Sequence, residues 1–280
     1  MTVDLNKIKA VAIDLDGTLL APDREVTPTT VSAVQRLKEI GVKPVICTGR
    51  PLQGVIDLVH KLNLLAPDDL IITYNGGLIQ RPASGEVLKK VTLSLDDLSS
   101  LLKLAEAINM PLAVVDATNA YLLNEPLGRQ SGYPKIMTKL PFSHVSLSDF
   151  STSHQFNKIL FSYDVDVLNA AIKEIPKDYY DRFTIMKSRP NLLELLPKTV
   201  NKGHAISDLA SILEVPVSAI MAIGDQENDL PMIKKAGIGV AMGNAIPEVK
   251  AVADMVTTTN AEDGVAKVFE QLISARKHQI

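Results

Sequence analysis

The 280-residue sequence contains no tryptophan, one cysteine and only 4% aromatic residues. With so few rings to stack on bases and a net charge of −3, the chain gives no reason to expect nucleic acid as a partner. Cys47 alone cannot form an internal disulfide. No run approaches the roughly 18 uninterrupted apolar residues of a membrane span, and no long apolar stretch precedes the first N-terminal carboxylates. We therefore expect a cytoplasmic protein with no membrane segment.

The rest of the composition is typical of a globular protein, with 46% hydrophobic and 22% charged residues. Its length exceeds the roughly 150 residues of an average domain, which favours two domains. From residue 9 to about residue 74, predicted strands alternate with predicted helices. Thr27 and Pro28 are typical of a helix start and Gly41 of a helix end. This alternation, which returns after residue 200, predicts an α/β fold with a doubly wound, Rossmann-like parallel sheet.

The middle of the chain has a different pattern. Ser94 and Asp97 form a capping box at the start of an amphipathic helix. Two pairs of short apolar segments are spaced as hairpins, and one more segment is typical of a strand: PLAVVD with AYLLN, RFTIMKS with NLLELLP, and FNKILFS. We therefore expect a core formed by residues 1–81 and 200–280, and an inserted α+β cap over residues 82–199.

Carboxylates gather where two predicted strands of the core end. Asp14 and Asp16 end the first strand, in AIDLDGTLL, and point to the same side because side chains alternate along a strand. The segment AIGDQENDL places Asp225, Asn228 and Asp229 at the end of a later strand. If the two strands are neighbours, the carboxylates raise each other's pKa unless a cation lies between them. An all-oxygen site favours Mg²⁺.

Two further segments supply groups that suit an anion. Thr48 and Gly49, in CTGR, lie just ahead of a predicted helix, whose backbone N–H groups and dipole favour a phosphate. Lys202, in VNKGHA, brings a positive charge to the start of another helix. Together with a carboxylate-bound cation, these groups describe a phosphoryl-transfer site. A carboxylate nucleophile fits this chemistry because aspartyl-phosphate is a known covalent intermediate.

The segments DLDGTLL, TGR, NKG and GDQEND, in this order, resemble the four motifs of the haloacid dehalogenase (HAD) superfamily. A large α+β insertion between the second and third motifs is similar to subclass IIB, the Cof-type sugar phosphatases. The resemblance covers essentially the whole chain. It implies a phosphatase rather than a dehalogenase, because Asp16 stands two residues after the nucleophile position.

The resemblance also implies a role for each motif residue. Asp14 would be the nucleophile and a Mg²⁺ ligand. Asp16 would act as general acid and then general base, with its backbone carbonyl on the metal. Thr48 and Lys202 would bind the phosphoryl group, and Lys202 would also restrain Asp14.

The fourth motif completes the implied site. Asp225 would be the third protein ligand of the Mg²⁺ ion, Asp229 would support it without direct contact, and Asn228 would bind the substrate phosphate. We expect positions in the cap to decide substrate specificity. Arg189 and Asn75 are candidates, but a structural role fits each at least as well.

The leading hypothesis is a Mg²⁺-dependent phosphatase of small phosphorylated metabolites, with sugar phosphates favoured. A phosphosugar mutase or phosphotransferase, similar to the phosphomannomutases, is an alternative on the same motifs. Flavin-precursor phosphates and pyridoxal phosphate are alternative substrates. A protein that only binds phosphometabolites is disfavoured, since it needs neither a nucleophile nor an acid–base group. The oligomeric state is left open.

Overall fold

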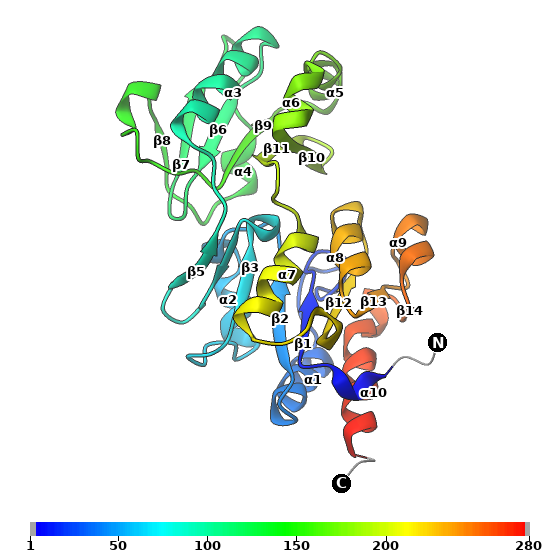
Figure 1. The fold of residues 1–280 in the computed structure, drawn as a ribbon. Coiled ribbons are helices and arrows are strands. Elements are labelled where there is room, and N and C mark those ends of the chain that lie inside the picture. The colour runs from blue at the N-terminus through cyan, green and yellow to red at the C-terminus, as the bar shows by residue number, and fades with distance from the viewer. Residues whose placement is uncertain (1–3, 278–280) are drawn as a thin grey trace. The chain divides into compact units, whose positions relative to one another are not determined.

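The apolar run Ala10–Ile13 forms β1, a fully buried strand inside an eight-stranded sheet of the computed structural model, which describes residues 4–277 (Figure 1). β1 pairs in parallel with β2 on one side and with β12 on the other. The strand order is β14 (Met255–Val256), β13 (Ile238–Ala241), β12 (Ile220–Gly224), β1, β2 (Lys43–Cys47), β3 (Ile71–Thr73), β4 (Leu78–Gln80) and β5 (Val87–Lys90).

From β1 the chain fills the sheet in one direction through β2 and β3, and later in the other direction through β12, β13 and β14. Right-handed connections therefore place the helix after β1 and the helix after β12 on opposite faces. The order reverses between β1 and β12, where ligands bind in folds of this kind. The predicted doubly wound parallel sheet is confirmed.

The first helix, α1 (Pro28–Glu39), begins as predicted. The Thr27 side chain accepts a hydrogen bond from Thr30 N, and Pro28 occupies the first turn. α1 packs against α10 (Gly264–Lys277), and α7 (Lys202–Ile212) packs against α8 (Leu230–Lys235). The other helical segments of this unit are α2 (Ile56–Lys61), α9 (Pro247–Val252) and the 3₁₀ turns Leu5–Lys7, Leu52–Gly54, Tyr74–Gly76, Val217–Ala219, Glu227–Asp229 and Asn260–Glu262.

The chain divides into two units, one formed by the residues up to Lys89 and from Asn201 onward, the other by Lys90–Val200. The first division lies later than the expected boundary at residues 81 and 82. β4 pairs antiparallel with β3, and Arg81 N donates to Glu86 O at 2.9 Å, so the chain turns back into β5 at the sheet edge. Residues 82–89, which we expected in the cap, thus belong to the core unit. Because β5 is largely exposed, no buried apolar pattern marks it as core.

The second unit has its own six-stranded sheet. Both predicted hairpins form: β6 pairs antiparallel with β7, and β10 with β11. The predicted strand FNKILFS forms β9, which lies between β6 and β11. The strand order is β10 (Phe183–Arg189), β11 (Leu192–Pro197), β9 (Lys158–Ser162), β6 (Leu112–Val115), β7 (Ala120–Asn124) and β8 (Phe142–His144).

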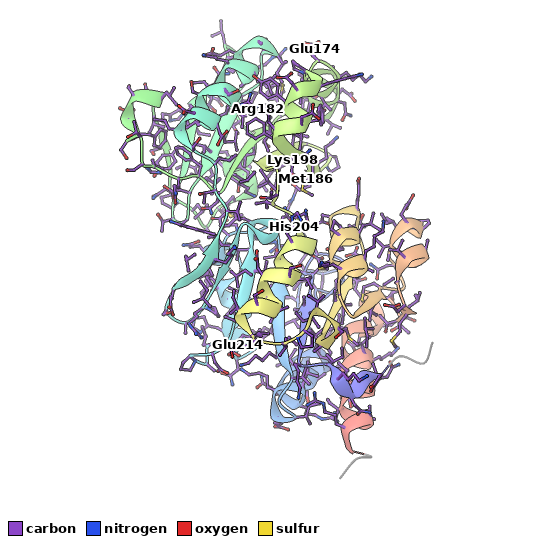
Figure 2. The ribbon with its side chains drawn as sticks, viewed as in Figure 1. Glu174, Arg182, Met186, Lys198, His204 and Glu214 are labelled. Carbon is purple, nitrogen blue, oxygen red and sulfur yellow. The ribbon has the colours of Figure 1, made fainter. Side chains whose placement is uncertain are left out.

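Helices of this unit cover a separate hydrophobic core. Ser94 and Asp97 form the predicted capping box of α3 (Leu95–Ala107), which buries Leu98 and Leu101. Arg182 belongs to this unit (Figure 2), and its guanidinium carbon lies 5.0 Å from the ring centroid of Phe183. The remaining helices are α4 (Tyr133–Ile136), α5 (Val165–Lys173), α6 (Lys177–Arg182) and the 3₁₀ turn Leu147–Asp149. No helix within residues 4–277 is long and apolar enough to cross a membrane.

Candidate active site

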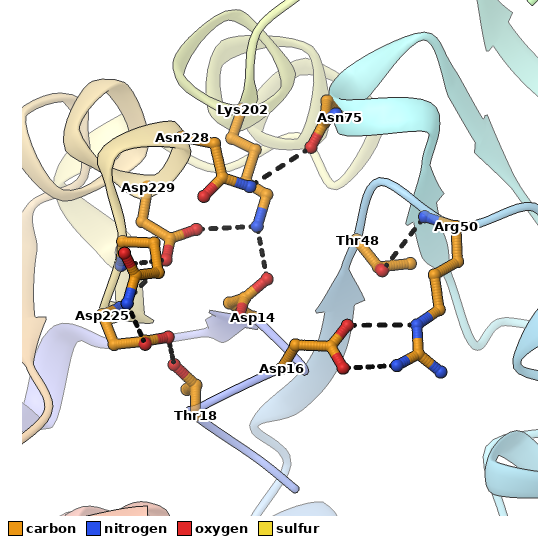
Figure 3. Close-up of polar contacts among 11 residues, drawn as sticks. Asp14, Asp16, Thr18, Thr48, Arg50, Asn75, Lys202, Asp225, Asn228 and Asp229 are labelled. Carbon is orange, nitrogen blue, oxygen red and sulfur yellow. Dashed lines mark hydrogen bonds and ion pairs between the residues drawn. The ribbon is translucent and has the colours of Figure 1, made fainter. Parts of the chain in front are cut away.

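Three carboxylates meet where β1 and β12 end. Asp14 directly follows β1, and Asp225 directly follows β12; the parallel pairing of the strands brings their ends together. Asp229 lies four residues further on, at the end of a 3₁₀ turn. One oxygen atom from each of the three side chains lies within 4.8 Å of the others, and all three residues are buried (Figure 3). The structure thus brings Asp14, Asp225 and Asp229 together, as predicted.

Lys202 stands between two of these carboxylates. Its Nζ donates to Asp14 Oδ1 at 2.5 Å and to Asp229 Oδ1 at 2.7 Å, and its side chain is fully buried. The preceding residue, Asn201, caps α7 by accepting a hydrogen bond from His204 N. Burial lowers the pKa of Lys202, but the two carboxylates outweigh burial and raise it above its ordinary value. Lys202 therefore carries a positive charge in the site.

One ammonium group does not neutralise three carboxylates. Burial, with Asp229 as the next largest cause, raises the pKa of Asp14 well above its ordinary value despite the opposing effect of Lys202. Burial likewise raises the pKa of Asp225 to about 6. Buried carboxylates with raised pKa values are typical of functional sites. A further positive charge beside them would favour their ionised forms.

The hydrogen bonds divide the carboxylate oxygens into engaged and available ones. Both oxygens of Asp229 accept hydrogen bonds: Oδ1 from Lys202, and Oδ2 from the backbone N–H groups of Asp225 and Gln226. Asp225 accepts from Thr18 Oγ1 at 2.8 Å and from the Gln226 side chain at 3.2 Å. Among the residues from 4 to 277, none donates a hydrogen bond to Asp14 Oδ2, so this oxygen is available for chemistry.

The donor set fits a hard divalent cation. Its three members offer carboxylate oxygens, with neither imidazole nor thiolate among them, which suits Mg²⁺ better than zinc or copper. All three side chains could contribute an oxygen; that Asp14 and Asp225 hold the cation directly stays a prediction, since both oxygens of Asp225 also accept hydrogen bonds. Asp229 would act through its hydrogen bonds. Cys47 is close by, but burial raises the pKa of its thiol to about 12, so it stays protonated and is a poor ligand.

Asp16 does not join the buried cluster. Its side chain is 52% exposed and forms a two-pronged ion pair with Arg50, in which Arg50 Nε donates to Oδ2 at 3.1 Å and Arg50 Nη2 donates to Oδ1 (Figure 3). The paired geometry occupies both oxygens of Asp16.

Thr48 and Gly49 follow β2, the strand next to β1, as predicted. No helix begins directly after them, however, and this expectation is wrong. Pro51 is extended, a 3₁₀ turn covers Leu52–Gly54, and α2 starts only at Ile56. The Thr48 hydroxyl instead accepts a hydrogen bond from Arg50 N at 3.2 Å. The loop after β2 therefore presents its polar groups without a helix dipole directly behind them.

The fourth motif adds one more polar group. Asn228 lies in the 3₁₀ turn Glu227–Asp229, and its Nδ2 donates to Asn75 Oδ1 at 3.4 Å (Figure 3). Asn75 comes from the turn after β3 and is buried.

Motif spacing did not indicate three other contacts of the site. Arg50, the last residue of TGR, pairs with Asp16. Thr18, in DGTLL, and Gln226, in GDQEND, both donate to Asp225. The sequence feature that could have indicated all three contacts is that these residues lie inside the motifs. A motif residue that is neither nucleophile nor ligand is available to orient the residues that are.

Comparison with known proteins identifies the family. Residues 11–269 match the haloacid dehalogenase-like hydrolases, and the chain belongs to this family. It is 38% identical to the Bacillus subtilis protein named "Putative phosphatase YxeH", over 96% of this chain and 99% of that one. It is 31% identical to the B. subtilis 5-amino-6-(5-phospho-D-ribitylamino)uracil phosphatase YwtE, over 96% of this chain and 99% of the relative.

Among solved structures, a haloacid dehalogenase-like hydrolase from Bacteroides thetaiotaomicron superimposes with a TM-score of 0.82 at 30% identity, covering 95% of this chain and 99% of that one. The family predicted from the four motifs is confirmed. The subclass stays a prediction. The predicted enzyme class, a phosphoric monoester hydrolase, is confirmed as well.

Proposed function

We propose that the protein is a Mg²⁺-dependent phosphatase that hydrolyses small phosphomonoesters, with sugar phosphates favoured, through a phosphoaspartate on Asp14. The proposal rests on one observation. Lys202 is the only positively charged side chain among residues 4–277 that hydrogen-bonds to the three buried carboxylates of the site, and it donates to Asp14 Oδ1. No residue in the same range donates a hydrogen bond to Asp14 Oδ2. Lys202 thus holds Asp14 in one orientation and leaves the other oxygen to attack phosphorus. A bound Mg²⁺ would supply charge stabilisation for the transferring phosphoryl group.

In the first half-reaction, Asp14 Oδ2 forms a bond to phosphorus and the bond from phosphorus to the leaving alkoxide breaks. Asp16 donates a proton to this alkoxide, which requires one of its oxygens to leave Arg50. In the second half-reaction, Asp16 takes a proton from water, the water oxygen attacks phosphorus, and the bond to Asp14 breaks to release phosphate. Thr48, Gly49, Lys202 and Asn228 would bind the phosphoryl oxygens throughout.

A second substrate class is supported by a specific comparison. The relative YwtE is named for a phosphate ester on a ribityl chain, a polyol derived from a sugar. We therefore include 5-amino-6-(5-phospho-D-ribitylamino)uracil with hexose and pentose phosphates as test substrates. Pyridoxal phosphate is the third class. Release of inorganic phosphate indicates hydrolysis, whereas an isomerised sugar phosphate would indicate the mutase alternative.

The test is Asp14→Asn, which keeps the shape of the side chain but removes its nucleophilic charge. We expect phosphate release to fall below a few per cent of wild type while the melting temperature stays similar or rises, because a buried charge is removed. Asp96→Asn, an exposed carboxylate at the start of α3, is the matched control and should keep full activity. Retained turnover of Asp14→Asn, or retained wild-type turnover in excess chelator, would contradict the proposal.

The cytoplasmic location stays a prediction.

A further inference from the structure

The turn that follows β3 has an unusual backbone. Seven non-glycine residues in the described chain have positive φ, and Tyr74 (φ 54°) and Asn75 (φ 56°) are the two that are adjacent. Left-handed backbone is uncommon for a bulky residue such as tyrosine and costs of the order of 1–3 kcal/mol. Both residues are buried, with 1% and 3% of their surface exposed. Strain of this kind persists where the surrounding structure enforces it, and it is concentrated at functional sites.

The strained turn is fixed between two segments of the candidate active site. Asn75 N donates to Thr48 O at 2.9 Å, which joins the turn to the loop that carries Thr48 and Gly49. On its other side, Gly76 (φ 101°) approaches α7 so closely that a Cβ there would lie 2.8 Å from Asn201 O. The turn therefore touches the TGR loop and the residue that precedes Lys202.

This backbone aims the Asn75 carboxamide at two groups expected to bind phosphate. A Cβ added to Gly49 would lie 3.0 Å from Asn75 Nδ2 and 3.1 Å from Oδ1, so the carboxamide packs directly against the Gly49 backbone. Asn75 Oδ1 also accepts the hydrogen bond from Asn228 Nδ2 (Figure 3). Asparagine suits the position because its short polar side chain tolerates the left-handed region.

We propose that Asn75 is a positioning residue of the phosphate site, one that fixes the Asn228 carboxamide and the Gly49 backbone in the orientation that binds the phosphoryl group. The proposal rests on the proposed function, because Asn228 and Gly49 matter only if the site binds a phosphate ester. It assigns the strained turn a task that neither Asp14 nor the metal ligands perform.

The experiment is a double-mutant cycle with Asn75→Gly and Asn228→Ala. Glycine adopts the left-handed backbone without strain and removes the whole side chain, carboxamide included. Asn63→Gly is the matched control, because Asn63 also has positive φ (52°) but lies on the surface at the end of α2. Each variant is assayed with p-nitrophenyl phosphate at saturating Mg²⁺, and inhibition by inorganic phosphate gives a second measure of phosphate affinity.

We expect Asn75→Gly and Asn228→Ala each to raise KM and the inhibition constant of inorganic phosphate roughly tenfold, the scale of one hydrogen bond, with kcat changed much less. The KM of the double variant should lie within about twofold of the KM of the more impaired single variant, because both changes break the same arrangement. Asn75→Asp, which keeps the shape but adds a negative charge, should raise KM further.

The proposal is overturned if Asn75→Gly matches Asn63→Gly in KM, if Asn228→Ala is silent, or if the two effects multiply in the double variant. Should Asn75→Gly lose its melting transition, Asn75→Asp carries the test, and a wild-type KM for that variant overturns it. Asp14→Asn, assayed alongside, distinguishes failure of the proposed function from failure of this inference. Activity in that variant refutes the proposed function, whereas a dead Asp14→Asn with an unaffected Asn75→Gly refutes this inference alone.

Discussion

Asp16 and Asp14 lie two residues apart, yet their surroundings differ sharply. Asp14 is buried against Lys202, whereas Asp16 is half exposed and bound on both oxygens by Arg50. A buried carboxylate restrained on one oxygen suits a nucleophile, which must meet phosphorus in one geometry. A solvent-facing carboxylate suits proton transfer, because it must exchange its proton with water and with the leaving group. The two environments fit the two roles that we propose.

The replacement Asp16→Asn should therefore act differently from Asp14→Asn. We expect phosphate release to fall by roughly 10²–10⁴-fold, the usual contribution of a general acid–base group, while attack by Asp14 continues slowly. Rapid-quench measurement with a substrate whose leaving group needs no proton, such as p-nitrophenyl phosphate, should show a smaller loss than with a sugar phosphate. Equal losses for the two substrates would contradict the acid role.

The structure explains why the residue directly after Asp16 is a glycine, Gly17. Its φ is +85°, and a Cβ there would overlap the Asp225 carboxylate. Gly85 has a similar φ of +73°, but a Cβ there would have no atom within 4 Å, so it carries the backbone cost alone. We expect Gly17→Ala to be more destabilising than Gly85→Ala, which should cost about 1–2 kcal/mol. Only Gly17→Ala should weaken Mg²⁺ binding, measured by titration calorimetry. Equal effects on binding would mean that Gly17 does not shape the site.

At this scale, motif spacing predicted which carboxylates meet but not how each side chain is oriented. Asp14 and Asp225 follow neighbouring parallel strands, so their meeting follows from topology. The pairing of Asp16 with Arg50 depends on a rotamer choice that no spacing determines. The Asn75 contacts depend on a left-handed turn, and Asn-Gly-Gly indicates a turn without indicating its direction.

At the scale of elements, local signals were reliable where they involve neighbours in sequence. The Thr27 cap, the Ser94–Asp97 capping box and both hairpins of the second unit formed as predicted. Two predictions failed where a longer context decides. The edge strand β5 has little buried apolar surface, and the loop after Gly49 contains Pro51 in an extended conformation where a helix was expected.

The turn of the β6–β7 hairpin provides an element-scale test. Burial raises the pKa of Asp116, but hydrogen bonds from Thr118 N, Asn119 N and Tyr121 outweigh burial and hold the pKa below its ordinary value of 3.8. The His154 ring contacts the same carboxylate at 3.1 Å. Because the pKa is lower in the folded state, ionised Asp116 stabilises the fold above pH 3.8, and this contribution disappears as the pH falls through the folded-state pKa.

We therefore expect Asp116→Asn to lower the stability of the second unit at pH 7 by about 1 kcal/mol, the scale of one net hydrogen bond. The difference from wild type should shrink as the pH falls below about 4, since wild type then loses the same charge. Urea denaturation at a series of pH values measures this. Asp96→Asn, at an exposed position of α3, is the control. If the stability difference between Asp116→Asn and wild type stays constant down to about pH 2.5, the lost stability comes from the shape of the side chain and not from its charge.

At the scale of the whole molecule, the two units have separate hydrophobic cores. Every buried residue of one core lies within Lys90–Val200, and every buried residue of the other lies outside that segment. Lys89, the last residue of the first unit before the insertion, forms an ion pair with α7 of that same unit, with its Nζ 3.4 Å from Asp208 Oδ1. Each unit should therefore fold without the other.

Replacing Lys90–Val200 with a short Gly/Ser bridge should give a folded core that keeps the carboxylate cluster, because Asp14, Asp225, Asp229 and Lys202 all belong to the first unit. We expect this core to bind Mg²⁺ and to hydrolyse p-nitrophenyl phosphate slowly. Because we expect the inserted unit to select the substrate, this core should lose most of its discrimination among sugar phosphates. Lys90–Val200 expressed alone should melt cooperatively. A bridged core that ranks sugar phosphates as the full chain does would place specificity within the first unit instead.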